Sequence, residues 1–233
     1  MKKILIIVII ILSIFLIYLT TIDKKVYYLT LGDEITLGMT QEGKYERSYA
    51  DYIKKYLQEK NILEIYINDY ATKDYRITDL IKDIENNKTI ENKTIKNSLI
   101  KSDLLTLSIG TNDIISKIDN MNKLTKLDYN KLYKNINEII IDLDKLLKLI
   151  REYCKEDIIM TGIYIEPTTE ELKQILEYAN QKFKETTTKY NITYIDMYEV
   201  IKPSKPLNIY PNKQEHEQIS KIIIDIINNN LLK

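Results

Sequence analysis

The chain has few of the residues from which common catalytic and metal centres are built. Its 233 residues include one histidine, one cysteine, two phenylalanines and no tryptophan, against nineteen tyrosines. One histidine and one cysteine cannot supply the ligands of a Cys/His zinc site, and we expect neither a metal nor a cofactor. The lone Cys154 also excludes a disulfide within the chain. A histidine that takes part in catalysis must be His216.

Neither sign of charge is in excess, since 34 lysines and arginines balance 34 aspartates and glutamates. A balanced chain lacks the basic footprint of a nucleic-acid-binding protein, so no nucleic-acid partner is expected. Gly-x-Ser-x-Gly, Walker A and Gly-x-Gly-x-x-Gly motifs are absent, which leaves α/β-hydrolase and nucleotide-binding functions without support. The chain is 44% hydrophobic and 29% charged. This composition predicts a folded globular protein with a sizeable core.

The longest hydrophobic run lies at the N-terminus, from Ile4 to Leu19, after two lysines. As a helix it spans about 24 Å, and flanking Tyr18 and threonines can extend it to the membrane interface. A cleaved signal peptide and an uncleaved signal anchor are both compatible with this pattern. No small-x-small cleavage pattern follows the run, which favours the anchor. We therefore predict a transmembrane anchor over residues 1–22 and a domain over residues 23–233 on the extracytoplasmic side of a cell membrane.

The exported part alternates short β-like runs with helical patterns. Five strands are expected at residues 26–31, 62–67, 104–109, 158–163 and 192–197. Helices are expected between them, including a long one over about 129–153 and one that Thr168 or Thr169 caps. Residues 86–97 are polar and are expected to form a surface excursion. The alternation predicts an α/β fold, in which a five-stranded parallel sheet is covered by helices on both faces and ligands bind beyond the carboxyl ends of the strands.

Three short motifs follow the predicted strand ends. Residues 31–38 read Leu-Gly-Asp-Glu-Ile-Thr-Leu-Gly, residues 110–113 read Gly-Thr-Asn-Asp, and residues 207–212 read Leu-Asn-Ile-Tyr-Pro-Asn. Their spacing resembles the SGNH (GDSL) hydrolase family of esterases and acylhydrolases, whose fold is a flavodoxin-like three-layer α/β/α sandwich. Residues 69–74 look like the second block of that family. The resemblance covers nearly all of the chain from Val26 onward.

The resemblance also indicates which functional residues are replaced. The position of the nucleophilic serine holds Glu34, and the position of the glycine that donates its backbone N–H to the oxyanion hole holds Asp74. The oxyanion asparagine is retained as Asn112. The orienting aspartate and the base histidine are replaced by Leu207 and Tyr210. No catalytic set is therefore intact, and we predict little or no ordinary esterase activity.

The replaced positions still define a candidate pocket made of Asp33, Glu34, Asp74, Asn112 and Tyr210. If the alignment holds, the carboxylates of Glu34 and Asp74 project into one crevice and can bind a cation, an amine or a sugar, or perform acid/base chemistry. Alternatively, Glu34 pairs with Lys73, Arg76 or a backbone N–H and fills an inactive site. Asp33 and Asp113 are expected to bond to local backbone at the strand-to-loop turns.

His216 is expected to pack rather than to catalyse. It lies three residues before Ile219, on the apolar face of the last predicted helix. The favoured hypothesis is a membrane-anchored binding module for glycans, lipids or proteins of a bacterial envelope. One alternative is an active ester, acyl or glycan hydrolase with an unorthodox site built on Glu34, Asp74, Asn112 and Tyr210. Another keeps hydrolysis through a serine elsewhere, with His216 as its base.

Overall fold

The core of the molecule is a five-stranded parallel sheet. The computed structural model describes residues 25–117, 129–167, 169–201 and 209–230. The strands lie in the order β2-β1-β5-β6-β7, and they comprise β1 Val26–Gly32, β2 Leu63–Ile67, β5 Leu104–Ser108, β6 Asp157–Thr161 and β7 Thr193–Ile195. Counted within this sheet alone, the order is 2-1-3-4-5, the flavodoxin-like arrangement. All five predicted strands and their parallel pairing are confirmed.

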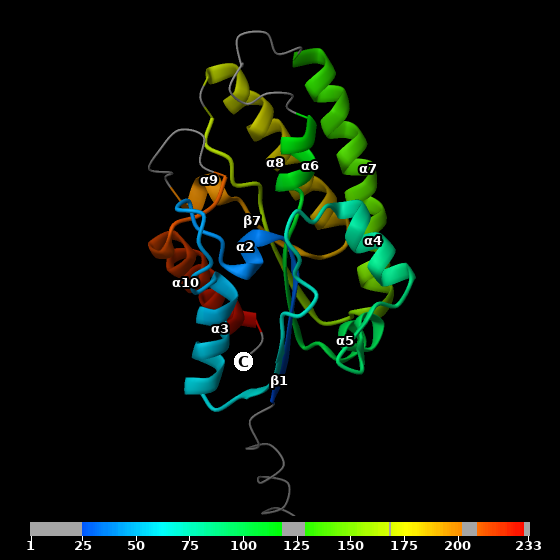
Figure 1. The fold of residues 1–233 in the computed structure, drawn as a ribbon, viewed down its shortest axis with the longest axis vertical. Helices are drawn as coiled ribbons and strands as arrows, with labels where there is room; N and C mark the ends of the chain where they lie inside the picture. Colours follow the sequence, from blue (N-terminus) through cyan, green and yellow to red (C-terminus); the bar gives the residue numbers. More distant parts are fainter. Residues whose placement is uncertain (1–24, 118–128, 168, 202–208, 231–233) are drawn as a thin grey trace, which may run out of the picture.

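Helices cover both faces of this sheet (Figure 1). One face packs against α4 (Ile77–Glu85), α5 (Ile95–Lys101), α7 (Tyr129–Tyr153) and α8 (Glu170–Lys189). The other packs against α3 (Tyr49–Glu59), α9 (Met197–Val200) and α10 (Lys213–Asn230). Alternate residues of β1 enter opposite cores, since Leu29 and Leu31 belong to the first and Tyr28 to the second. Two-sided burial explains why the strands read as continuous apolar runs rather than as alternating patterns.

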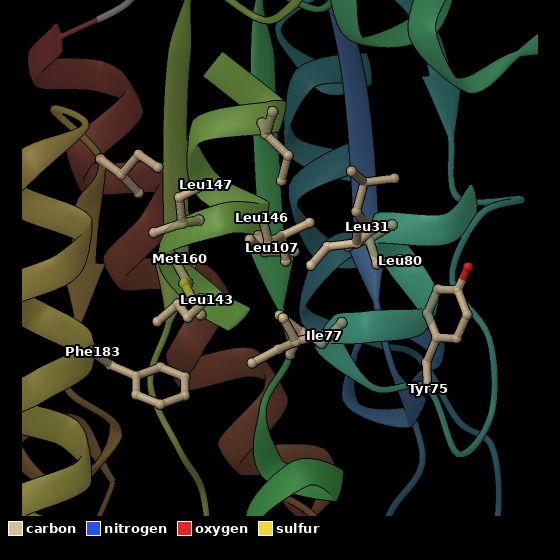
Figure 2. Packing of buried hydrophobic residues seen from close by; sticks show 14 of the residues in the cluster. Leu31, Tyr75, Ile77, Leu80, Leu107, Leu143, Leu146, Leu147, Met160 and Phe183 are labelled. Atoms are coloured by element: carbon tan, nitrogen blue, oxygen red, sulfur yellow. The ribbon is translucent and has the colours of Figure 1, made fainter. Parts of the chain in front are cut away.

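The core on the α7 side is the larger of the two. Figure 2 shows Leu31 and Leu107 of the sheet with Ile77 and Leu80 of α4 and a row of leucines from α7 (Leu143, Leu146 and Leu147). All of these side chains are fully buried. The predicted long helix has the bounds expected for it, because its apolar residues recur at helical spacing along one face.

The polar stretch over residues 86–97 is more ordered than its composition suggests. It holds a two-stranded antiparallel hairpin, β3 (Thr89–Ile90) with β4 (Lys93–Thr94), and the first turn of α5. Thr94 caps α5 by accepting a hydrogen bond from the backbone N–H of Asn97. Ile95 and Leu99 of α5 are fully buried in the core. The prediction of a surface excursion is therefore wrong for the last residues of this stretch. There, two buried side chains one turn apart hold a mainly polar helix against the core.

Two remaining predictions concern helix ends and the membrane. Thr169 is the cap of α8, since its Oγ1 accepts a hydrogen bond from the N–H of Leu172 at 3.1 Å. Thr168 and the whole predicted anchor over residues 1–22 lie outside the described residues. Within the described ranges, no helix combines the length and the apolar character needed to cross a membrane.

Candidate functional site

The candidate site lies where strands β1 and β5 end side by side. The sheet order reverses between these two strands, and ligands of open α/β sheets bind at such a switch point. Two short helices start there, α2 (Glu34–Leu37) after β1 and α6 (Thr111–Lys117) after β5. The two loops approach so closely that a Cβ on Gly32 would lie 2.1 Å from the carbonyl oxygen of Ser108. Glycine is therefore required at this position.

Glu34 is the centre of the site. Its side chain is fully buried, and its carboxylate accepts three hydrogen bonds. The backbone N–H of Asp74 donates to Oε1 at 2.9 Å, Nδ2 of Asn112 donates to Oε2 at 2.9 Å, and the hydroxyl of Tyr210 donates to Oε1 at 3.4 Å. These donors come from three separate segments of the chain. The structure thus brings together four of the residues that the sequence pattern singled out.

Asp74 contributes its backbone rather than its carboxylate. Its side chain is exposed, and its φ of 58° lies in the left-handed region that favours glycine. Such a backbone aims the N–H at Glu34, which is the role that the resemblance assigns to a glycine there. The expected crevice with two projecting carboxylates is not what the geometry presents. Of the two carboxylates, only that of Glu34 is buried, and it accepts a hydrogen bond from a backbone N–H. The inactive-site alternative proposed such a partner for Glu34.

Asn112 is held in position by a second contact. The same Nδ2 that donates to Glu34 also donates to the carbonyl oxygen of Tyr75 at 3.1 Å. The loop between β2 and α4 is further tied to β1, since the N–H of Thr72 donates to the carbonyl oxygen of Gly32 at 3.0 Å. The N–H of Asp74 and the amide of Asn112 are therefore both preorganised toward one point. That point is occupied by the carboxylate of Glu34.

Asp33 directly precedes Glu34 and is buried. Its Oδ1 accepts a hydrogen bond from the N–H of Ile35 at 3.1 Å, which caps α2 as the local-backbone prediction expected. Its Oδ2 has no hydrogen-bond partner among the described residues. Burial, reinforced by the neighbouring charge of Glu34, raises the pKa of Asp33 well above its usual range. Asp33 therefore has a structural role in the β1–α2 turn.

Tyr210 has the environment of a hydrogen-bond donor, not of a base. Burial, and then the charge of Glu34, raise the pKa of its hydroxyl above the ordinary value of 10. A phenol with a raised pKa keeps its proton at neutral pH and cannot accept one from a nucleophile. Leu207, which takes the position of the orienting aspartate, lies outside the described residues.

Asp113 follows Asn112 but faces a different helix. Its Oδ2 accepts a hydrogen bond from the N–H of Ile77 at 3.1 Å, at the start of α4. Burial raises the pKa of its carboxyl to about 6. The partner of Asp113 is thus remote in the sequence, which differs from the local bonding that we expected. The contact still gives it a structural role, since it joins α6 to α4.

His216 is a packed residue of α10, as helical register predicted. Its imidazole is fully buried. Its Nδ1 accepts a hydrogen bond from the N–H of Tyr49 at 3.3 Å, which leaves Nε2 as the nitrogen that donates to the carbonyl oxygen of Met39 at 3.2 Å. Both ring nitrogens are therefore engaged by backbone groups. Neither is available to activate a serine.

The buried imidazole makes the stability depend on pH. Burial lowers the pKa of His216 from 6.5 to about 4. Between these values the unfolded chain binds more protons, so stability is lost as the pH falls from 6.5 to 4. Urea unfolding should show that the natural protein has a higher free energy of unfolding than His216→Gln at pH 7. This difference should shrink by about 3 kcal/mol between pH 7 and pH 4. A constant difference between the two proteins across this range would contradict the buried environment.

The fold and the site together define a class. A 2-1-3-4-5 parallel sheet with a Gly-Asp-x turn after β1 and a Gly-x-Asn-Asp turn after β5 is the arrangement of an SGNH-type hydrolase domain. A sequence model of the GDSL-like Lipase/Acylhydrolase family matches residues 30–216. The chain belongs to this family. None of the curated proteins matches it by sequence.

Solved structures with the same fold include enzymes. The lipase Lip_vut3 from a goat rumen metagenome is 19% identical, with a TM-score of 0.69 over 85% of this chain and 95% of that one. Axe2, an acetylxylan esterase from Geobacillus stearothermophilus, is 20% identical, with a TM-score of 0.64 over 88% of this chain and 95% of that one. Identities this low establish the shared fold alone.

Proposed function

We propose that this protein is a family member that does not hydrolyse esters and acts as a binding module. The observation that carries the proposal is the occupied oxyanion hole. The N–H of Asp74 and the amide of Asn112, which would stabilise a developing oxyanion, both donate to the carboxylate of Glu34 at 2.9 Å. A substrate carbonyl needs donors that are free to bind its oxygen, and the oxyanion that develops from it would be repelled by the carboxylate of Glu34 at this point.

The missing nucleophile and base support the same proposal. Glu34 stands where a serine would attack, and both of its oxygens already accept hydrogen bonds. Tyr210 stands where a histidine would take the proton, and its raised pKa makes it a donor. An unorthodox hydrolase built on Glu34, Asp74, Asn112 and Tyr210 is disfavoured by geometry, since both carboxylate oxygens of Glu34 already accept hydrogen bonds and the side chain of Asp74 is exposed to solvent. A serine that works with His216 is disfavoured by the two backbone bonds of that imidazole.

We also propose where in the cell the binding module is located. The apolar run from Ile4 to Leu19 supports a membrane anchor, with the domain on the extracytoplasmic side of a bacterial membrane. The ligand class would be a glycan, lipid or protein of the envelope. The related folds include a lipase and an acetylxylan esterase, which favours an acylated glycan or lipid as the recognised group. Fractionation of cells that express the full chain or a chain lacking residues 1–22 tests the anchor.

A covalent probe tests the loss of hydrolysis. A fluorophosphonate reacts with any serine that an adjacent base activates, wherever that serine lies. The purified protein should remain unlabelled under conditions in which an active acetylxylan esterase is labelled completely. Stoichiometric labelling of any serine of the folded protein would overturn the proposal, and peptide mapping would identify the nucleophile.

A further inference from the structure

We infer that Asp33 and Glu34 form a proton-controlled latch on the oxyanion hole. The pair holds one proton, which resides on Asp33, and the carboxylate of Glu34 leaves the hole when that proton is lost. This inference rests on the proposed function, because it adds a regulation to the same site. The donors that Glu34 now occupies then become available to the oxygen of a ligand only at a pH that ionises Asp33.

The first observation is that two consecutive carboxyl groups are buried without a cation. Asp33 is 1% exposed and Glu34 is fully buried. Across the described ranges, neither forms a salt bridge with a lysine, an arginine or a histidine. Two carboxyl groups that share a buried site do not both ionise, because the second charge loses its water and is repelled by the first. The pair therefore carries one negative charge and one proton.

The hydrogen bonds indicate which residue of the pair holds the proton. The carboxylate of Glu34 accepts hydrogen bonds from all three donors of the site. Asp33 accepts one at Oδ1, from the N–H of Ile35, and its buried Oδ2 has no partner among the described residues. Donors stabilise the charged form of a carboxyl group, so the negative charge belongs to Glu34. The proton belongs to Oδ2 of Asp33, since a buried hydroxyl without a partner costs less free energy than a buried charge without one.

The groups that face Asp33 from other elements also favour its neutral form. These groups are Asp113 on α6, Tyr49 on α3 and Tyr210 before α10. None of the three is a cation. Burial, and then the charge of Glu34, raise the pKa of Asp33 well above its usual range, and the charge of Asp113 acts in the same direction. Asp33 therefore remains protonated at a pH at which an exposed aspartate is ionised.

The rim of the site leaves Glu34 a route to solvent. Asp74 is exposed, and Asn112 and Tyr210 are half-buried. When Asp33 ionises, two adjacent charges repel each other in a buried environment, where this repulsion is stronger than in water. The carboxyl of Asp33 is held in the turn by its backbone hydrogen bond. Rotation of the Glu34 side chain toward solvent is therefore the movement that relieves the repulsion.

The pH dependence of stability tests the proton count. The folded chain keeps the proton of Asp33 at a pH at which the unfolded chain has lost it, so stability falls as the pH rises above about 4. Asp33→Asn has no such proton to lose. Urea unfolding of the full chain in a neutral detergent should show the unfolding constant of the natural protein rising, relative to that of Asp33→Asn, by about tenfold from pH 4.5 to pH 5.5. A ratio that does not change with pH would overturn the inference.

Nuclear magnetic resonance of the natural protein tests the latch itself. The isotope-labelled full chain would be titrated in the same detergent from pH 5 to pH 10. The carboxyl carbon of Asp33 should titrate within this range. The backbone nitrogen of Asp74 should shift with the same midpoint, because its N–H then loses the carboxylate of Glu34. An Asp33 that is ionised at pH 5 or still protonated at pH 10, or an Asp74 that does not respond while Asp33 titrates, would overturn the inference.

Asp113→Asn is the matched control for this titration. It removes a neighbouring carboxyl group whose pKa is raised by burial to about 6, and it should keep the shift of Asp74 that follows Asp33. Asp33→Asn should abolish that shift, and loss of the shift in both variants would overturn the role of Asp33. The covalent probe judges the proposed function separately. A labelled serine would contradict the loss of hydrolysis whatever the state of Asp33, whereas an unlabelled protein with an ionised Asp33 at pH 5 would contradict the latch alone.

Discussion

Restoring the family residues together is expected to create ester hydrolysis. The variant combines Glu34→Ser, Asp74→Gly, Leu207→Asp and Tyr210→His. It supplies a nucleophile, a base and an orienting acid, and it frees the two donors that now bind Glu34. Turnover of nitrophenyl acetate should rise at least about a hundredfold over the unmodified protein, the lower end of what a positioned base contributes.

The matched control keeps Glu34 and carries the other three substitutions. It should remain as inactive as the unmodified protein, because the carboxylate still occupies the oxyanion hole and no nucleophile is present. Circular dichroism would verify that each variant is folded. A folded four-residue variant with no gain in turnover would indicate that the aligned positions do not face one another as a catalytic set.

Removal of the Glu34 side chain is expected to destabilise the protein strongly. In Glu34→Ala, the N–H of Asp74, the amide of Asn112 and the hydroxyl of Tyr210 lose a shared acceptor. Buried donors that lose a charged partner destabilise a protein by roughly 1.5–3 kcal/mol each, partly offset by water that enters the vacated space. We expect the free energy of unfolding to fall by about 3 kcal/mol and the melting temperature by about 10 °C.

The same variant should gain an affinity for small carboxylates. Acetate or formate can place its oxygens where those of Glu34 were, so it should raise the melting temperature of Glu34→Ala in proportion to the logarithm of its concentration. The unmodified protein should show no such response, since its own carboxylate fills the position. Chloride at equal ionic strength controls for screening. Loss of stability without rescue by acetate would argue against a preorganised hole.

Asp74 shows how much of the site the sequence could predict. The resemblance indicated that a glycine position held an aspartate, and this substitution suggested a second carboxylate in the crevice. The backbone at Asp74 instead keeps the left-handed conformation with φ of 58° and turns the side chain to solvent. Sequence motifs specify which residue occupies a position. They do not specify whether its side chain or its N–H faces the site, because that depends on φ and ψ.

Glu34 illustrates the same limit of prediction from sequence motifs. Its place after β1 was predictable from the Gly-Asp-x motif, and pairing with a backbone N–H was one of the alternatives. The resemblance also placed Asp74, Asn112 and Tyr210 beside it, but it did not predict that all three donate hydrogen bonds to its carboxylate from three different loops. The strands and long helices were predictable because apolar periodicity reports burial directly. Helix α5 was missed because only its buried Ile95 and Leu99 carry that signal.

Ester turnover with and without Asn112 tests the central claim most directly. The claim is that the carboxylate of Glu34 occupies the oxyanion hole and that the protein therefore does not hydrolyse esters. The purified protein and its Asn112→Ala variant would be compared on nitrophenyl acetate under identical conditions. We predict no turnover above the buffer rate for either protein. Robust turnover by the unmodified protein that is lost in Asn112→Ala would contradict the claim, because it would mean that the amide of Asn112 stabilises a substrate oxyanion despite Glu34.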